Sequence, residues 1–153
     1  MKNLLFALVA VTLLMSCKST GGTGFSDVTG KEWKLIEVRI SDTFNREILF
    51  DRKALSRENA GNVFTIRFDN DNLSGTAAPN RYSAPFSLGE TSNSISVNPI
   101  RTTMMAALWQ PERLRESEYY QYLQNIYRWE LINGRLVLSS KSEDGREIRM
   151  TYE

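Results

Sequence analysis

The chain has 153 residues, with 19 lysines and arginines against 18 aspartates and glutamates, no histidine and one cysteine. This composition excludes a histidine-based catalytic triad, a metal site built from imidazoles or several thiolates, and an internal disulfide. The length fits one domain whose core is large enough to fold without cross-links.

The N-terminal segment is typical of a bacterial lipoprotein secretion signal. Lys2 precedes a 12-residue apolar run, Leu4–Met15, which is shorter than the roughly 20 residues that a permanent membrane span needs. The run leads into Leu14-Met15-Ser16-Cys17, which is similar to a lipobox. We expect residues 1–16 to be removed and Cys17 to carry the lipid, such as palmitate. The alternative is an ordinary signal peptide with an incidental cysteine.

The mature chain is expected to have no net charge, because the removed segment contains one lysine and no acidic residue. A neutral body gives no electrostatic reason to expect nucleic acid, or adsorption to anionic lipid beyond the anchor on Cys17. Lys18 follows that cysteine, where enteric lipoproteins retained in the inner membrane carry an acidic residue. We therefore expect a lipid-anchored protein of the cell envelope, at the outer membrane.

Residues 17–30 are rich in Gly, Ser and Thr and predict a flexible tether that reaches on the order of 20 Å, followed by a folded domain over residues 31–153. Glu32–Ile40 predicts the first strand. Its apolar residues change phase once, which predicts a bulge. They are Trp33 and Leu35 on one phase, and Ile36, Val38 and Ile40 on the other.

Short strands and turns are expected next. Ser41–Gly61 is less regular, with a short strand at Ile48–Phe50 and a helical turn or two within Asp51–Asn59. Val63–Phe68 alternates like a half-buried strand, and Asp69–Asn72 is a turn cluster. The cluster offers oxygen ligands for Ca²⁺ but lacks the glycine and glutamate of an EF-hand loop, so we expect a hairpin turn and no cofactor. Further strands are expected at residues 73–77, 80–88 and 94–98.

A helix is predicted over Glu112–Asn125, with Pro111 in its first turn and an apolar stripe on one side. The stripe consists of Leu114, Tyr119, Tyr122, Leu123 and Ile126. Asn133-Gly134 predicts a tight hairpin, and residues 148–152 supply the last strand. The order predicts a mainly β (α+β) fold, in which about eight antiparallel strands meander into a small barrel with the helix packed on it.

Six short motifs follow one another through these predicted elements. They are Trp33-x-Leu35, then Gly75 with Asn80-Arg81-Tyr82, then Thr103-x-Met105-Ala106, then Glu118, Tyr119 and Leu123, then Tyr127-x-Trp129, and finally Gly134-x-Leu136-x-Leu138. Their order and spacing resemble the META domain, also called HslJ-like, over about Gly30 to Tyr152. The resemblance implies a secreted or lipid-anchored envelope protein linked to stress or virulence, and it implies no established reaction.

The chain departs from many members of that family at two positions. Relatives carry Gly-Cys-Asn where this chain has Ala78-Pro79-Asn80, and a second cysteine where it has Ala107. The joint absence fits a pair of neighbouring cysteines in the relatives. It argues against a redox function here.

Asn80, Arg81 and Tyr82 form a candidate recognition patch, because arginine offers a fork of donors and tyrosine a flat amphipathic face. The alternative is structural: Asn80 satisfies backbone groups at a turn and Tyr82 packs. Thr103 and Met105 are candidates for lining a pocket, since methionine adapts to varied ligands, or they pack beneath the helix.

No catalytic residue is predicted. Glu116 and Glu118 are two apart on a helix and do not face each other, while Glu143 and Asp144 lie in a predicted turn. The tryptophans and the Tyr119–Tyr122 segment are expected mostly in the core, with one or two exposed rings marking a partner surface.

The expected function is therefore a non-enzymatic, lipid-anchored META-type module that binds an envelope protein. One alternative is an inhibitor of a lytic enzyme or protease, which would insert a protruding loop within Ser41–Gly61 into an active site. A second alternative is a carrier of a small hydrophobic ligand inside the barrel, against which the many large aromatic residues argue.

Overall fold

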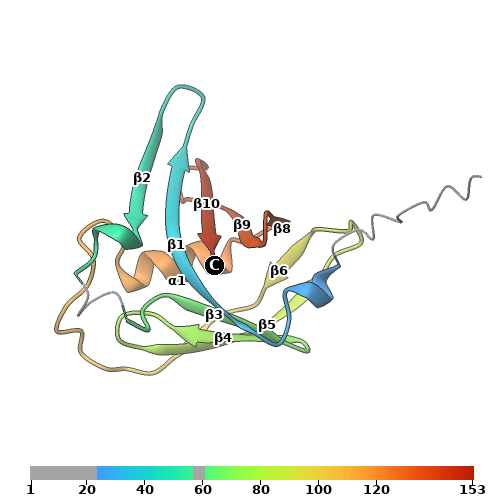
Figure 1. The fold of residues 1–153 in the computed structure, drawn as a ribbon, viewed down its shortest axis with the longest axis horizontal. Coiled ribbons are helices and arrows are strands. Elements are labelled where there is room, and N and C mark those ends of the chain that lie inside the picture. The colour runs from blue at the N-terminus through green and yellow to red at the C-terminus, as the bar shows by residue number, and fades with distance from the viewer. Residues whose placement is uncertain (1–23, 57–60) are drawn as a thin grey trace, which may run out of the picture.

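The computed structural model describes residues 24–56 and 61–153, so the predicted signal peptide and Cys17 lie outside the described residues. An antiparallel sheet of ten strands forms the body (Figure 1). The strands are β1 Glu32–Ser41, β2 Arg46–Asp51, β3 Thr65–Asp69, β4 Asn72–Thr76, β5 Arg81–Leu88, β6 Ile95–Val97, β7 Arg101–Thr102, β8 Arg128–Ile132, β9 Arg135–Lys141 and β10 Glu147–Tyr152.

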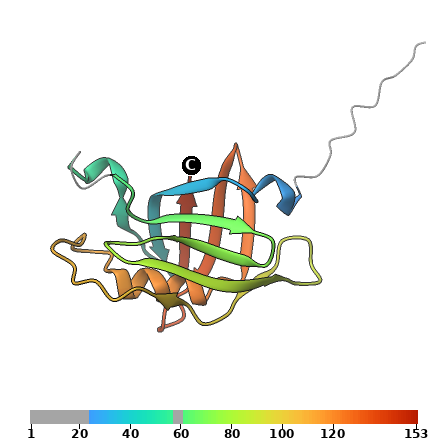
Figure 2. The same ribbon diagram turned by 90° about the horizontal axis from the view of Figure 1, so that it is seen from below.

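The sheet curls into a nearly closed barrel. Its strand order is β6-β5-β4-β3-β1-β10-β9-β8, with β2 paired to β1 and β7 to β5. The two end strands meet through a bridge between Ser94 and Arg128, and Trp129 N donates to Asn93 O at 2.9 Å. The α-helix of the described residues, α1 Glu116–Gln124, lies across one side of the curled sheet (Figure 2). The predicted mainly β fold with one packed helix is confirmed.

Strand β1 joins the two halves of the barrel. Its first residues pair with β3, and its later residues pair with both β2 and β10. The pairing with β10 shifts register between Leu35 and Glu37, where the apolar residues change phase. The bulge expected from the sequence is therefore present, and it lets Leu35 and Val38 both point into the core.

Inward-facing residues fill the interior. The alternation in β3 buries Ile66 and Phe68, and that in β10 buries Ile148, Met150 and Tyr152. Trp33 is 1 % exposed, and its indole Nε1 donates to Val28 O at 2.9 Å. The apolar stripe predicted for the helix region is buried throughout.

Residues 24–30 differ from the expected tether. Phe25–Asp27 form a 3₁₀ helix, η1, and Val28 is fully buried. The Phe25 ring lies 5.0 to 5.4 Å from the rings of Phe68, Phe86 and Trp129. Residues 24–30 therefore pack against the barrel through Phe25 and Val28. The Gly/Ser/Thr-rich composition of the segment as a whole did not predict this contact.

The helix is shorter than predicted at its start. It begins at Glu116 because side chains there accept the backbone N–H groups of its first turn: Glu118 accepts from Arg115 N at 2.7 Å, and Gln110 accepts from Glu116 N at 3.0 Å. Pro111 therefore lies in the preceding loop. No helix among the described residues is long and apolar enough to cross a membrane.

Two turns predicted from their Asn, Asp and Gly residues are present in the structure. Asp69–Asn72 is the β3–β4 turn, with Asn70 at φ 51°, and Asn133-Gly134 joins β8 to β9. The described residues contain no group of three carboxylate or cysteine side chains that would hold a metal ion. Strand β2 is longer than expected and continues into a second 3₁₀ helix, η2 Arg52–Ala54. Strand β7 was not predicted.

Candidate functional site

Asn80 is the centre of a partly buried polar cluster that joins three parts of the chain. Its Nδ2 donates to Glu116 Oε2 at 2.7 Å and to Met105 O at 3.1 Å. Its Oδ1 accepts from Thr103 Oγ1 at 2.8 Å and from Met105 N at 2.7 Å. We call Asn80, Thr103, Met105 and Glu116 the Asn80 cluster. It fixes the end of the β4–β5 turn to the start of α1 and to the segment between them.

The Glu116 carboxylate is held in the same cluster by backbone donors. Its Oε1 accepts from Ala78 N at 3.0 Å and from Asn80 N at 2.8 Å. The residue is only 9 % exposed. A buried carboxylate needs such donors to replace the water that it loses on folding.

Gly75 and Tyr82 form a second part of the motif, on paired positions of β4 and β5. A Cβ atom on Gly75 would lie 2.0 Å from Thr65 O and 2.7 Å from the Tyr82 hydroxyl, so a side chain has no room there. The hydroxyl of Tyr82 instead donates to Thr65 O at 2.7 Å. The glycine is therefore needed for the tyrosine to reach the backbone of β3.

Three tyrosine hydroxyls form a chain inside the barrel. The hydroxyl of Tyr119 lies 3.1 Å from that of Tyr82 and 3.2 Å from that of Tyr152. Burial raises the pKa of Tyr119 to about 12, and burial raises the pKa of Tyr82 and of Tyr152 further above the ordinary value. All three phenols therefore remain protonated at neutral pH, where they act as neutral hydrogen-bonding groups of the core.

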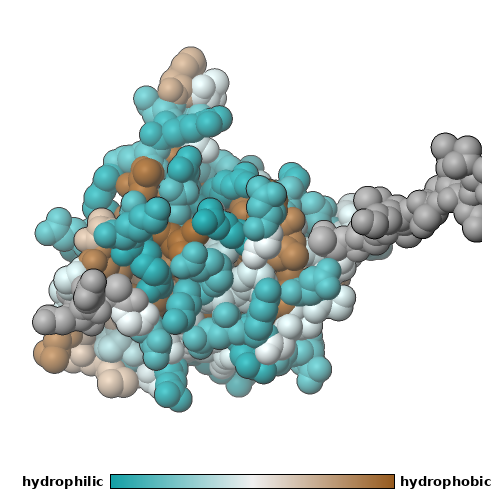
Figure 3. Space-filling model, in the orientation of Figure 1, coloured by the Kyte–Doolittle hydropathy of each residue, from teal (hydrophilic) through white to brown (hydrophobic). Residues whose placement is uncertain are grey.

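The segment over residues 103–109, which we call the apolar loop, leads away from the Asn80 cluster to the surface. Met104 is 99 % exposed, Met105 61 %, Leu108 102 % and Trp109 37 %. Figure 3 shows apolar surface at its lower left, over the segment between β7 and α1 in Figure 1. Four apolar side chains exposed within one short loop are typical of an interaction site.

A groove of about 480 Å³ adjoins the apolar loop at Trp109. It runs between β2 with η2 on one side and residues 109–113 on the other, and Ile48, Phe50 and Leu55 supply apolar lining. An ion pair between Arg113 and Glu47 connects its two walls. The groove could receive an apolar side chain that projects from a partner.

The comparisons with known proteins agree with this architecture. The family model of the META domain matches residues 26–151. The chain belongs to the META domain family. A search of curated proteins finds no match to it.

Two solved structures share the fold of this META domain. One is the NMR structure of a protein from Burkholderia xenovorans, with a TM-score of 0.55 and 16% identity over 82% of this chain and 83% of the other. The second is the crystal structure of a DUF4847 family protein from Bacteroides vulgatus, with a TM-score of 0.51 and 10% identity over 82% of this chain and 94% of the other.

The META domain places the residues predicted as a recognition patch in different environments. Asn80 and Tyr82 are 6 % and 3 % exposed and make the structural contacts of the alternative reading, while Arg81 is exposed. Thr103 and Met105, predicted separately as pocket lining, belong with Asn80 to one cluster. Asn80 from the first predicted group and both residues of the second are therefore parts of a single structural unit, to which the side chains of Arg81 and Tyr82 do not belong.

Sequence reasoning missed the role of Glu116. It was weighed only as one of a pair with Glu118, and the two do not face each other. No local signal indicated its contact with Asn80, which is 36 residues away in the chain; its place in the first turn of a helix was the only hint of a structural role. The helix boundary had to be known first.

The hairpin between β1 and β2 projects from the body (Figure 1). At its tip, Asp42 Oδ1 accepts from the backbone N–H groups of Phe44 and Asn45, both at 2.7 Å. These two bonds lower the pKa of Asp42, because they stabilise its charged form. The Phe44 side chain is 92 % exposed on this structured turn.

Proposed function

We propose that this protein is a lipid-anchored module of the cell envelope, held at the outer membrane by Cys17, that binds another envelope protein through the apolar loop and catalyses no reaction. The observation that carries the proposal is the exposure of Met104, Met105, Leu108 and Trp109 in one segment. Side chains of this size stabilise a complex by about 1.5–3 kcal/mol each when they are fully buried.

The chemistry of the loop supports a protein partner. Methionine adapts to irregular surfaces, and tryptophan is enriched among the residues that dominate binding energy. The groove beside Trp109 offers the partner an apolar recess next to the loop. An anchor on Cys17 would keep the module at the membrane, where a partner in the same compartment is met at high local concentration.

The Asn80 cluster supports binding in another way. The Asn80 side chain holds the backbone of Met105 at the base of the loop, because Asn80 Nδ2 donates to Met105 O and Met105 N donates to Asn80 Oδ1. A loop held at its base loses less conformational entropy on binding than a free one, so more of the contact energy appears as affinity.

In-cell chemical crosslinking of the full chain, followed by mass spectrometry, tests the proposal. We expect one reproducible partner with the unchanged protein, and loss of that partner in a double variant, Met104→Ser with Leu108→Ser. Cys17→Ser should also reduce the crosslink by removing the anchor. Leu88→Ser is a matched control, because Leu88 is 47 % exposed on β5 and lies outside the loop.

Three results would contradict parts of this proposal. Retention of the partner in the loop variant would contradict the apolar loop as the binding surface. Equal loss in Leu88→Ser would show that general surface apolarity, rather than this loop, carries the interaction. Substrate turnover by the purified protein, abolished by a point substitution, would contradict the non-catalytic part of the proposal.

A second candidate function rests on the β1–β2 hairpin. A projecting turn with Phe44 at its tip has the shape expected of an inhibitor that enters the active site of a lytic enzyme or protease. For this function, Phe44→Ser should abolish the crosslink while the double loop variant retains it. The reverse result supports the apolar loop.

A further inference from the structure

Four arginines occupy the face of the sheet that points away from the core. On β10, Ile148, Met150 and Tyr152 point inward, so Arg149 between them points outward. Strand pairing, with a register shift in β2, and shared lining of the same hollows place three other arginines on this side. We call the four the arginine face: Arg39 on β1, Arg46 on β2, Arg135 on β9 and Arg149 on β10.

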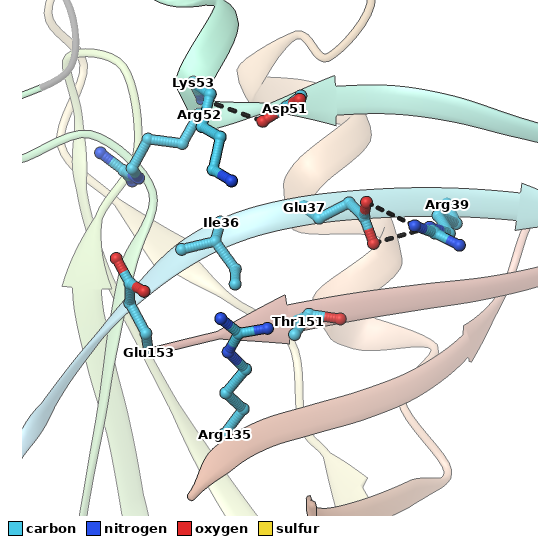
Figure 4. A pocket seen from close by; sticks show the side chains of 9 residues that line it. All are labelled: Ile36, Glu37, Arg39, Asp51, Arg52, Lys53, Arg135, Thr151 and Glu153. Carbon is cyan, nitrogen blue, oxygen red and sulfur yellow. Dashed lines mark hydrogen bonds and ion pairs between the residues drawn. The ribbon is translucent and has the colours of Figure 1, made fainter. Parts of the chain in front are cut away.

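The arginine face is hollowed into a continuous groove. Three hollows of about 320, 390 and 410 Å³ lie on it. Glu37 lines all three, Arg39 is shared by the first and second, and Arg149 by the second and third. In the first, Arg135 reaches from β9 across Thr151 toward Ile36 on β1 (Figure 4).

Basic side chains outnumber acidic ones in the lining of this groove: Arg39, Arg46, Arg52, Lys53, Arg135 and Arg149 stand against Glu37, Asp51, Glu147 and Glu153. Arg39 pairs with Glu37 at 2.6 Å, and Glu147 accepts a hydrogen bond from the Tyr127 hydroxyl. Arg46, Arg135 and Arg149 make no ion pair with any residue that the structure describes. Arg52, at the groove's end, is engaged in donating to backbone carbonyls and is not counted among them.

Two of the arginines oppose each other directly. Arg39 and Arg149 are cross-strand partners in the β1–β10 ladder, and both point to the outer face. Like charges in directly opposite positions destabilise a sheet. An anion held between the two guanidinium groups would remove that repulsion, and the guanidinium fork matches a carboxylate in shape and charge.

The other residues that line the groove favour an anion with spaced charges over a densely charged one. Val137 and Ser139 are 3 % and 7 % exposed on this outer side, so the floor contains apolar as well as polar surface. The lining also contains four carboxylates, which would repel a densely charged polymer such as polyphosphate: Glu37, Asp51, Glu147 and Glu153. A polypeptide in which acidic side chains alternate with uncharged ones avoids that repulsion while it reaches the arginines.

We propose that the arginine face binds an extended acidic segment of a protein. From Arg46 to Arg135 the face extends over about six residues of strand, roughly 20 Å, which an extended segment of similar length would cover. This surface is separate from the apolar loop and does not depend on the function proposed above.

Fluorescence anisotropy with the full chain in detergent tests the proposal. The probe is a labelled peptide of about eight residues in which glutamate alternates with valine, long enough to span the face. The matched peptide has glutamine in place of glutamate. We expect the glutamate peptide to bind, the glutamine peptide to bind at least about tenfold more weakly, and added salt to weaken binding.

Arg149→Gln is the decisive variant, and it should weaken binding of the glutamate peptide at least about tenfold. Arg101→Gln is the matched control, because Arg101 is also an exposed arginine without an ion pair among the described residues, and it lies on β7. The melting temperature of Arg149→Gln should equal or exceed that of the unchanged protein, which separates lost binding from lost folding.

Three results would overturn the proposal. The first is equal binding of the two peptides, and the second is an equal loss of affinity in Arg149→Gln and Arg101→Gln. The third is inorganic polyphosphate that displaces the glutamate peptide and binds more tightly, which would assign the face to a uniformly charged polyanion instead.

Discussion

The Asn80 cluster and the arginine face are both polar, but they differ in how many of their polar groups have partners within the protein. In the cluster, Asn80 donates to or accepts from Thr103, Met105 and Glu116, and both oxygens of Glu116 have partners. On the face, Arg149 stands opposite Arg39 without an ion pair among the described residues. Buried polar groups need partners within the fold, whereas exposed arginines are hydrated and keep their donors available for a ligand.

Removal of a cluster residue should have the largest effect. Asn80→Ala breaks four side-chain hydrogen bonds and leaves part of the buried Glu116 carboxylate without a donor. We expect it to lower the free energy of unfolding by about 4 kcal/mol, measured by urea denaturation. Arg81→Ala, at the exposed neighbouring position, should change it by less than about 0.5 kcal/mol. Equal effects would show that the cluster is not what stabilises this region.

A second test uses pH to charge the buried tyrosines. Tyrosine in the unfolded chain ionises near pH 10, whereas the folded-state pKa of Tyr119 is about 12. Above pH 10 the unfolded state releases a proton that the folded state keeps, so stability falls as pH rises toward 12 and is unaffected below 10. Tyr119 alone should contribute a loss of about 2–3 kcal/mol.

Urea denaturation at about pH 9 and about pH 11.5 measures this loss. Tyr119→Phe removes the ionising group and should reduce the dependence on pH, while Tyr82 and Tyr152 retain theirs. An unfolding free energy that is unchanged between the two pH values would contradict the burial of Tyr119, which is what raises its pKa.

The smallest effect is expected on the arginine face, and it should have the opposite sign. Arg149→Gln relieves the repulsion with Arg39, part of whose charge Glu37 already offsets, so it should raise the free energy of unfolding by at most about 0.5 kcal/mol at low salt. The gain should disappear as salt screens the charges. A destabilised variant would show that Arg149 is compensated in the free protein.

The sequence predicted those parts of the fold whose pattern is local. The burial of Phe64, Ile66 and Phe68, the Asn133-Gly134 turn and the phase change in β1 each depend on residues that are close in the chain. The strand predicted over Val63–Phe68 begins later, at Thr65, because Phe64 has a φ of 52°. The helix start was less predictable, because Gln110 and Glu118 determine it by hydrogen bonds whose geometry does not appear in the apolar pattern. Strand β7 has two residues, too few to show a period.

The site was less predictable than the fold. Asn80 and Glu116 are 36 residues apart, and only the closed barrel brings them into contact. The motif residues Asn80, Arg81 and Tyr82 are adjacent in sequence, yet a strand turns neighbouring side chains to opposite sides. The arginine face combines residues from four strands, so no single segment indicated it.

The way in which Asn80 holds the apolar loop has a consequence for how relatives can diverge. Asn80 contacts the N–H and the carbonyl of Met105, not its side chain. Every residue except proline carries both groups. Substitutions at position 105 and at its exposed neighbours therefore leave the anchor intact, so a lineage can exchange one binding partner for another while the barrel beneath the loop keeps its structure.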